Sequence, residues 1–341
     1  MSTTRLPAEQ LAAALEPAAR RNIPLSGVAQ VRNFDRTDRG FATETYTFDL
    51  EDESGSLPMV FRRPPEMALF PDYDLLRQVL VMRRLADTDI PVATPIWLDR
   101  DGCDLGSPYF VMNRLTGEAP SDYPSYHVAG NYFEATPEQR ERMWWGCVDT
   151  IADIHRLDWR ALRLDFLALP RHGSSPVEQI VNYLDSALAW ATTGDQPETY
   201  RRAITYLRAN LYEPEHITLC WGDARMSNIL YDKDFRVSGV LDWEIAYLGD
   251  HEADLAWLLF LDWASSEFEG HAPLPGTPTR EETIAYYEKR SGMPVRNLRY
   301  NEILAAVLLS VPLLRMANRI QLPPEMNITG FCTTRIAQLL S

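Results

Sequence analysis

The sequence lacks the cysteine pairs that zinc and redox sites use. No C-x-x-C motif is present and the four cysteines lie far apart along the chain, so their spacing predicts neither kind of site. We expect buried thiols at Cys103, Cys147, Cys220 and Cys332.

Long hydrophobic runs are also missing. Residues 1–21 (MSTTRLPAEQLAAALEPAARR) have no apolar core followed by a small-residue cleavage site, which argues against a signal peptide and predicts a cytoplasmic protein. The most apolar stretch, 303–314, is interrupted by Ser310 and Pro312 and is too short to cross a bilayer. We expect a buried helix there and no membrane partner.

Positive charge is scarce in this chain. Lys and Arg number 33 against 48 Asp and Glu, for a net charge of −15, whereas a nucleic-acid-binding face needs clustered basic residues. Nucleic acid is therefore excluded as a partner. A cationic small molecule fits the charge better, although acidity that only maintains solubility is the simpler explanation. Nothing in the sequence indicates an oligomeric state.

The first third of the chain is rich in β-strand patterns. Residues 8–21 have helical spacing of apolar side chains, and two strands, 41–50 and 58–62, form a predicted hairpin. Residues 73–85 predict a helix that crosses this small sheet. A short buried strand, 109–112, follows.

From Pro137 onward the pattern is mainly helical, with a strand–loop–strand exception at 217–243. A chain of 341 residues exceeds the size of one hydrophobic core. We therefore predict an α+β fold with a β-rich lobe at 1–112, a hinge at 113–119 and a helical lobe at 120–341. The predicted helices of the second lobe are 138–157, 176–192, 197–211, 254–263, 280–290 and 301–320.

The strand–loop–strand segment carries a set of residues suited to phosphoryl transfer. Residues 219–231 read LCWGDARMSNILY and residues 240–244 read VLDWE. A kinase needs a carboxylate that orients the acceptor hydroxyl, an amide oxygen on Mg²⁺ five residues later, and a second carboxylate on the metal from the next strand. Asp223 matches the base, and Asn228 and Asp242 match the ligands of Mg²⁺, which prefers hard oxygen donors.

These motifs resemble those of the aminoglycoside phosphotransferase family, H-G-D-x-x-x-x-N and D-W-E, and GDHEADLA at 249–256 adds to the likeness. The resemblance covers about residues 25–259 and is greatest to a branch that includes kinase-like domains fused to acyl-CoA dehydrogenases. It implies a protein-kinase-like two-lobed fold, with ATP and Mg²⁺ as cofactors. It also implies a hydroxyl-bearing small molecule as the acceptor, without deciding between aminoglycosides, amines, sugars, hydroxy acids and macrolides.

Some positions depart from the family pattern or invite a structural interpretation. Trp221 stands where the family has His, and we expect its indole to brace the loop by packing. Asp254 resembles a structural Asp whose carboxylate caps amides of the catalytic loop. His155 is expected to support the core, and Trp257 to be a core residue.

The resemblance also places a nucleotide site in the first lobe. Gly40, Phe41 and Thr43 lie in the position of the nucleotide-covering loop, although one glycine is equally consistent with an ordinary hairpin turn. The hinge residues expected to offer backbone groups to adenine are Met112, Asn113 and Leu115.

Arg62 takes the place of the Lys that pairs with phosphate, and it keeps the positive charge. Arg63 should face the other side of its strand, and a solvated edge is the alternative for both residues. Gln78 stands where the family has Glu, so either Gln78 hydrogen-bonds Arg62 or Asp72 or Asp74 replaces the missing carboxylate.

Two other functions remain open at this stage. Trp221 and Gln78 are consistent with a weak or inactive nucleotide-binding relative, although the base and both metal residues are present. A metal-dependent hydrolase using Asp223 and Asp242 lacks the usual His cluster. Candidates for an acceptor pocket are Asp122, Tyr123, Tyr126, Tyr132 and Trp263.

Overall fold

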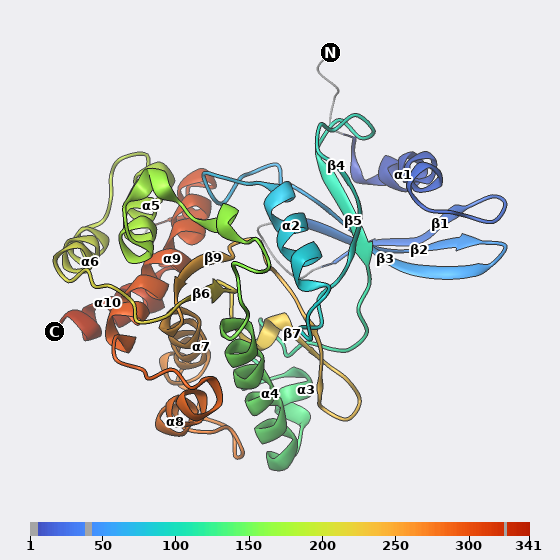
Figure 1. The fold of residues 1–341 in the computed structure, drawn as a ribbon. Helices are drawn as coiled ribbons and strands as arrows, with labels where there is room; N and C mark the ends of the chain where they lie inside the picture. The colour runs from blue at the N-terminus through green and yellow to red at the C-terminus, as the bar shows by residue number, and fades with distance from the viewer. Residues whose placement is uncertain (1–5, 38–42, 324–325) are drawn as a thin grey trace. The chain divides into compact units, whose positions relative to one another are not determined.

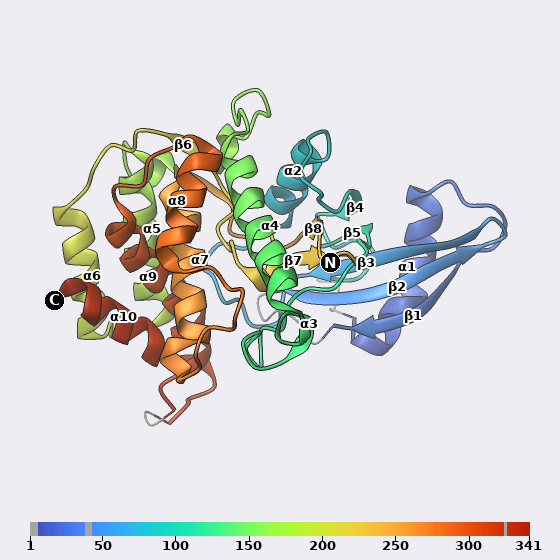
Figure 2. The same cartoon turned by 90° about the horizontal axis from the view of Figure 1, so that it is seen from below.

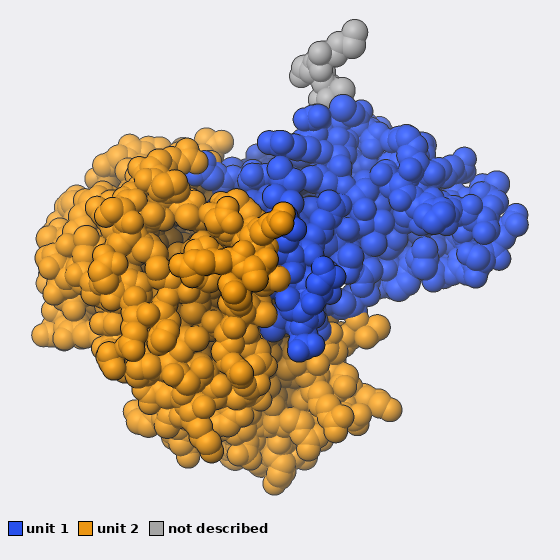
Figure 3. All heavy atoms as spheres, in the orientation of Figure 1, with its two compact units in different colours: residues 1–68, 72–115 blue, residues 69–71, 116–341 orange. Residues whose placement is uncertain are grey.

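The computed structural model describes residues 6–37, 43–323 and 326–341. The chain forms two compact units, which Figure 3 colours separately: unit 1 is Met1–Ala68 with Asp72–Leu115, and unit 2 is Leu69–Pro71 with Thr116–Ser341. The chain passes from unit 1 to unit 2 between Leu115 and Thr116, inside the segment 113–119. The predicted domain limits remain predictions, and each unit is described by itself.

Unit 1 contains an antiparallel five-stranded sheet in the order β1-β2-β3-β5-β4 (Figure 1). The predicted hairpin is present, with an unbroken register from Glu44 opposite Arg63 to Asp52 opposite Gly55. The second strand, Gly55–Arg63, is longer than the predicted 58–62, and the first ends at Asp52, two residues beyond the predicted end. Two strands were not predicted, because β1 is mostly polar and exposed and β4 begins at Pro95. The strands are β1 Gln30–Arg36, β2 Glu44–Asp52, β3 Gly55–Arg63, β4 Pro95–Asp99 and β5 Tyr109–Asn113.

Helix α1 (Ala8–Asn22) packs beside β1 (Figure 1 and Figure 2). Leu11 and Leu15, one turn apart, lie fully buried in one cluster with the inward side chains of β2, β3 and β5. Alternate residues of β2 are buried, as a strand with one core face requires. Helix α2 (Leu75–Leu85) packs on β4 and β5, and its N-terminus is capped by Asp74.

Unit 2 is mainly helical, as predicted. Helix α9 lies at its centre and packs against α5, α6, α7 and α10. Threonines at the starts of α4 and α8 form capping boxes with the third helical residue, which explains where these helices begin. The helices are α3 Gly130–Glu134, α4 Pro137–His155, α5 Pro176–Ala191, α6 Glu198–Ala209, α7 Glu252–Ser265, α8 Arg280–Ser291, α9 Leu298–Arg319 and α10 Gly330–Leu340.

Helix α9 is also the one helix within the described ranges that is long and apolar enough to span a membrane. The buried helix expected here is present, and it extends beyond the apolar stretch 303–314 at both ends. Most of its apolar window, 61%, is buried inside the protein. The core helix of a soluble protein passes the same test, so this is weak support for a membrane span.

Two small antiparallel sheets frame the loop that carries the motifs. Strand β6 (Ile217–Cys220) pairs with β9 (Tyr247–Asp250), and β7 (Ile229–Tyr231) pairs with β8 (Val237–Val240). The two runs predicted as strands therefore belong to different sheets. Their partners β7 and β9, of three and four residues, were not predicted.

The prediction that all four cysteines are buried is wrong for Cys103, which is exposed. It lies in the turn between β4 and β5, where its backbone N–H donates to Asp99 Oδ1 at 3.2 Å. Turn tips of this kind run over the surface because their backbone groups need water or local partners. Cys147, Cys220 and Cys332 are buried as expected.

Candidate active site

Gly222 allows the chain to leave β6 and enter the catalytic loop. Its φ is +90°, a left-handed conformation that only glycine adopts at no steric cost. A Cβ at this position would lie 2.5 Å from the backbone oxygen of Ile245, closer than real atoms approach. The glycine of the W-G-D motif is therefore required by a close approach of two backbones directly before Asp223.

Asp254, at the start of α7, holds the backbone of this turn through its carboxylate. Its two carboxylate oxygens accept hydrogen bonds from the backbone N–H groups of Trp221 and Gly222, at 2.7 and 2.8 Å. His155 Nε2 lies 2.9 Å from Asp254 Oδ2, and His155 Nδ1 lies 2.6 Å from the Tyr287 hydroxyl. Both residues are buried, and this geometry matches the structural roles that the sequence analysis gave to Asp254 and His155.

Trp221 joins the catalytic loop to the D-W-E segment. Its side chain is fully buried, and its indole N–H lies within hydrogen-bonding distance of two carbonyl oxygens, 2.8 Å from that of Leu241 and 3.2 Å from that of Asp242. The indole also packs against Trp243, with ring centroids 5.9 Å apart. The expected bracing role therefore includes a hydrogen bond that packing alone did not suggest.

The carboxylate of Asp223 is held by donors on both oxygens. Trp257 Nε1 donates to Oδ1 at 2.9 Å, and Asn228 Nδ2 donates to Oδ2 at 2.7 Å. The side chain of Asp223 is 15% exposed, so a small part of it faces solvent. Trp257 is buried as predicted, but its contact with the base was missed. The available signal was its position three residues after Asp254, on the same face of α7.

The surroundings of Asp223 raise the pKa of its carboxyl group. Burial raises the pKa of Asp223 above its usual value, and the negative charge of Asp242 adds to the rise. The guanidinium of Arg225 and the hydrogen bond from Asn228 act in the opposite direction. Perturbation by burial together with a defined set of charges is typical of functional carboxylates.

Asn228 and Asp242 are brought together by the pairing of β7 with β8. Ile229 lies opposite Val240, and the Leu241 N–H donates to the Asn228 carbonyl oxygen at 2.9 Å. Asp242 follows with a φ of +61°, which turns the chain directly after the ladder. The two predicted metal residues thus lie next to each other at one end of this small sheet.

This donor set fits a magnesium ion. The Asn228 side-chain nitrogen donates to the carboxylate and the backbone oxygen of Asp223, at 2.7 and 3.0 Å. Both bonds use the amide nitrogen, so the amide oxygen is the atom of Asn228 suited to a metal. The amide oxygen of Asn228 and the carboxylate of Asp242 are hard oxygen ligands of the kind that Mg²⁺ prefers, and phosphate and water complete such a shell.

In unit 1, Arg63 has a structural partner. Its Nε lies 2.7 Å from Glu44 Oε2, and its Nη1 donates to the Leu6 carbonyl at 2.8 Å. Arg62 and Arg63 are both buried, so the solvated-edge alternative is wrong for both. These contacts give Arg63 a structural role, and the assignment of Arg62 to the phosphates stays a prediction.

Gln78 is buried on α2, and its side-chain oxygen accepts no hydrogen bond from residues that the structure describes. The first of the two alternatives, a hydrogen bond from Arg62 to this oxygen, is therefore not formed. Asp74, one of the proposed replacements, instead caps α2 by accepting from Leu76 N at 2.9 Å.

The other residues predicted to bind the nucleotide lie in different kinds of position. Gly40 and Phe41 lie outside the described residues, while Thr43 is buried and its hydroxyl contacts that of Tyr73. Met112 and Asn113 belong to β5, and the Asn113 N–H donates to Thr94 O at 3.2 Å. Leu115 lies beyond the end of β5, which makes it the better placed of the three to offer its backbone to a ligand.

The acceptor candidates do not form one group. Tyr126 and Tyr132 are buried, with their hydroxyl groups 2.6 Å from Asp262 Oδ1 and 2.8 Å from Thr277 Oγ1, so both are structural. Tyr123 is 93% exposed, and Trp263 packs against Phe268. Asp122 contacts the catalytic loop itself. Its Oδ1 lies 2.6 Å from Arg225 Nη1.

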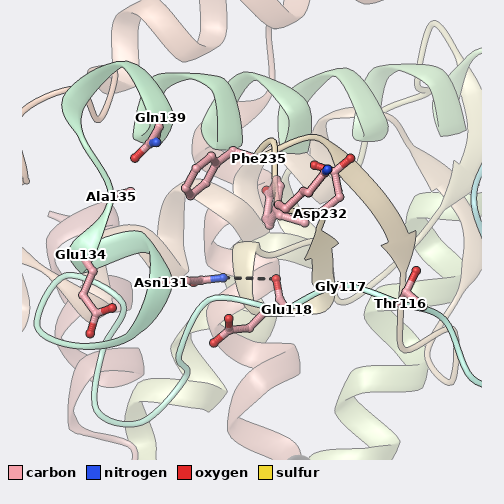
Figure 4. A pocket seen from close by; sticks show the side chains of 11 residues that line it. Thr116, Gly117, Glu118, Asn131, Glu134, Ala135, Gln139, Asp232 and Phe235 are labelled. Atoms are coloured by element: carbon pink, nitrogen blue, oxygen red, sulfur yellow. Dashed lines mark hydrogen bonds between the residues drawn. The ribbon is translucent and has the colours of Figure 1, made fainter.

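A separate cavity of about 550 Å³ lies in unit 2 beside the turn between β7 and β8 (Figure 4). Glu118, Asn131 and Glu134 line one part of it, and Asn131 Nδ2 donates to the Glu118 carbonyl at 3.2 Å. Tyr231 and Phe235 line another part. None of the residues predicted for catalysis or metal binding lines this cavity, so it is not the candidate active site.

The chain is similar in sequence to known proteins. Mouse acyl-CoA dehydrogenase family member 10 is 28% identical over 266 residues, which are 75% of this chain and 24% of that protein. The chain thus spans about a quarter of the length of that relative.

Two solved structures share the fold. A Ralstonia eutropha protein with a provisional aminoglycoside phosphotransferase assignment has a TM-score of 0.69 and 20% identity, covering 96% of this chain and 95% of its own. A thermostable mutant of aminoglycoside phosphotransferase APH(4)-Ia, in a ternary complex with ADP and hygromycin B, has a TM-score of 0.57 and 16% identity, covering 91% and 94%. The predicted α+β, protein-kinase-like fold class is therefore confirmed.

The family assignment rests on most of the chain. The match to the family extends over residues 37–289 and includes the loop of Asp223, the D-W-E segment and the start of α7. The chain belongs to the phosphotransferase enzyme family.

Proposed function

We propose that this protein transfers the γ-phosphoryl group of ATP to a hydroxyl group of a small molecule, with Mg²⁺ as the metal. One observation carries the proposal. Asp223 is oriented by Asn228 and Trp257 directly beside the oxygen donors of Asn228 and Asp242. Membership of the phosphotransferase family and the nucleotide complex of a structural neighbour support the same chemistry.

In this reaction the Asp223 carboxylate orients the acceptor hydroxyl and accepts its proton. The acceptor oxygen forms a bond to the γ-phosphorus, the bond to the β–γ bridging oxygen breaks, and ADP leaves. The transition state of such transfers is loose, so the protein contributes mainly position and charge. A bound Mg²⁺ would neutralise phosphate charge, and Asn228 and Asp242 are the residues that would hold it. The raised pKa of Asp223 suits a group that receives a proton.

The acceptor is proposed only as a class. The chain carries a net charge of −15, which favours a cationic or neutral hydroxyl compound over a polyanion. Neither the fold nor the family decides which compound is used, because related folds serve many acceptors.

The test is a coupled assay of ADP release with MgATP and a panel of hydroxyl-bearing metabolites and antibiotics. Asp223→Asn keeps the shape and removes the charge, so turnover with an accepted substrate should fall by roughly 10²–10⁴. ATP affinity should change little. Asp234→Asn, an exposed aspartate in the turn between β7 and β8, is the matched control and should leave turnover unchanged.

Two results would contradict the proposal. A loss below about tenfold for Asp223→Asn would move the base to another residue. Binding of MgATP without ADP release for any acceptor would favour the alternative of a nucleotide-binding relative without activity.

A further inference from the structure

Arg225 is a charged residue of the catalytic loop that the proposed reaction has not used. It lies two residues after Asp223, and its Nε is 3.1 Å from Asp223 Oδ1, within ion-pair distance. Its side chain is 23% exposed, so most of the guanidinium is shielded from water. A partly buried cation of this kind interacts more strongly with a neighbouring carboxylate than a solvated one does.

The other side of the guanidinium is held by Asp122. Arg225 Nη1 donates to Asp122 Oδ1 at 2.6 Å, and Ser227 Oγ donates to the same oxygen at 3.3 Å. Asp122 belongs to a different part of the chain, the segment that precedes α3. Arg225 therefore bridges two carboxylates that are 101 positions apart in the sequence, between Asp122 and Asp223.

The segment that carries Asp122 is itself anchored. Glu118 and Tyr231 exchange two backbone hydrogen bonds, at 2.9 and 3.0 Å, which dock this segment onto β7. Asn131 adds a bond to the Glu118 carbonyl at 3.2 Å. The backbone that carries Asp122 is therefore anchored. Contacts with a carboxylate on each side restrict the rotamers of the long Arg225 side chain and fix the position of its guanidinium.

We propose that Asp122 and Arg225 are positioning residues for the catalytic base. Asp122 holds the guanidinium of Arg225, and Arg225 holds Asp223 Oδ1 in the orientation in which the carboxylate receives the acceptor proton. This inference rests on the proposed function. Its physical reason is that a reacting group displaced by about 1 Å can lose roughly 10² in rate, while Trp257 and Asn228 each hold the carboxylate through only one hydrogen bond.

The first experiment measures ADP release from MgATP with water as the acceptor, since no organic acceptor is identified. Arg225→Met should lower kcat by roughly tenfold with little change in the KM for ATP. Asp122→Asn should lower kcat by a smaller factor. In the double variant the loss should equal that of Arg225→Met alone, because Asp122 acts through Arg225.

Conservative variants and controls separate this role from general destabilisation. Asp122→Glu keeps the charge and should recover most of the loss of Asp122→Asn. The matched control is an exposed ion pair on α6, Arg201 Nη2 to Glu198 Oε2 at 2.7 Å, where Arg201→Met and Glu198→Gln should leave kcat unchanged. Asp122 is 52% exposed, so its variants remain informative if Arg225→Met fails to fold.

The second experiment does not depend on turnover. The protein has nine tryptophans, and ¹⁵N labelling of their indoles gives a resonance for Trp257 Nε1, identified by its loss in Trp257→Phe. This N–H donates to the oxygen of Asp223 that Arg225 contacts. The resonance should therefore move in Arg225→Met and in Asp122→Asn, and should stay in place in Arg201→Met.

The outcomes distinguish the two proposals. If the wild type releases no ADP with water or with any compound of the acceptor panel, but the Trp257 resonance moves, the proposed function fails and the positional coupling stands. An unmoved resonance in both variants would overturn the inference, whatever the turnover. So would additive losses in the double variant, or an effect of Arg225→Met on the KM for ATP in place of kcat, which would assign Arg225 to the nucleotide.

Discussion

Trp221 shows at the residue scale how the catalytic loop tolerates an indole in place of a histidine. The side chain fills a fully buried space, and its N–H points at the carbonyl oxygens of Leu241 and Asp242. Two loops that are 20 residues apart are joined in this way. A buried carbonyl that loses its donor costs more than a hydrogen bond contributes when formed.

Trp221→Phe tests this link, because it keeps most of the aromatic packing and removes the N–H. We expect the free energy of unfolding to fall by about 1–3 kcal/mol, measured by urea denaturation. Trp145→Phe is the matched control, since the Trp145 indole makes a 3.3 Å contact with Glu141 on the exposed face of α4. Equal losses in the two variants would show that the contact to the D-W-E segment contributes no stability.

Helix α7 organises the site at the scale of elements. Asp254 and Trp257, one turn apart, contact the backbone and the carboxylate of the catalytic loop. At the first turn of the same helix, Glu252 accepts from the backbone N–H groups of Arg296 and Asn297, at 2.8 and 2.7 Å, directly before α9. One short segment therefore connects the chemistry to the central helix of unit 2.

Glu252 should make the stability of this connection depend on pH. Burial raises its pKa from 4.5 to about 7, and the charge of Asp250 adds to the rise. Between these values the folded protein holds a proton that the unfolded chain has released, so this contribution to stability falls as the pH rises from about 4.5 to 7.

The glutamine in Glu252→Gln has no titrating group, so this variant should not lose stability through this site as the pH rises. Relative to the wild type, its free energy of unfolding should improve by the order of 1–2 kcal/mol between pH 5 and pH 8. Urea midpoints at four pH values within this range provide the measurement. His251, whose pKa burial lowers to about 3, is present in both proteins and cancels in the comparison. A constant difference between the two proteins would contradict the prediction.

The sequence predicted the elements whose signal is local. Helix α5 was expected at 176–192 and runs over Pro176–Ala191, because its apolar residues repeat with helical spacing. Asp223, Asn228 and Asp242 were found by motif spacing, and the short ladder of β7 and β8 explains why Asn228 and Asp242 meet.

What was missed depends on contacts between distant positions. Trp257 reaches a residue 34 positions away, and Arg225 reaches one 103 positions away. Neither contact changes the local pattern of apolar and polar residues. Cys103 was misjudged for a related reason, since its exposure follows from the turn in which it lies and not from its residue type.

At the scale of the whole molecule, the proposed function predicts that nucleotide binding stabilises the folded chain. A ligand that binds only the folded state at a concentration one hundred times its Kd contributes about 2.7 kcal/mol. For a protein of this length, that corresponds to a rise in Tm of roughly 4 °C. The measurement is thermal denaturation at millimolar ATP with Mg²⁺, compared with ATP in excess EDTA.

Asp242→Ala should remove most of this rise, because it takes away the carboxylate proposed to hold the metal. Asp234→Ala, in the exposed turn of the same hairpin, should keep it. Asp223→Asn should also keep the rise, since the base contributes to turnover more than to binding. Loss of the rise in Asp223→Asn would place this carboxylate on the metal or the nucleotide. A wild type whose Tm does not respond to millimolar MgATP would contradict nucleotide binding itself, and with it the proposed phosphoryl transfer.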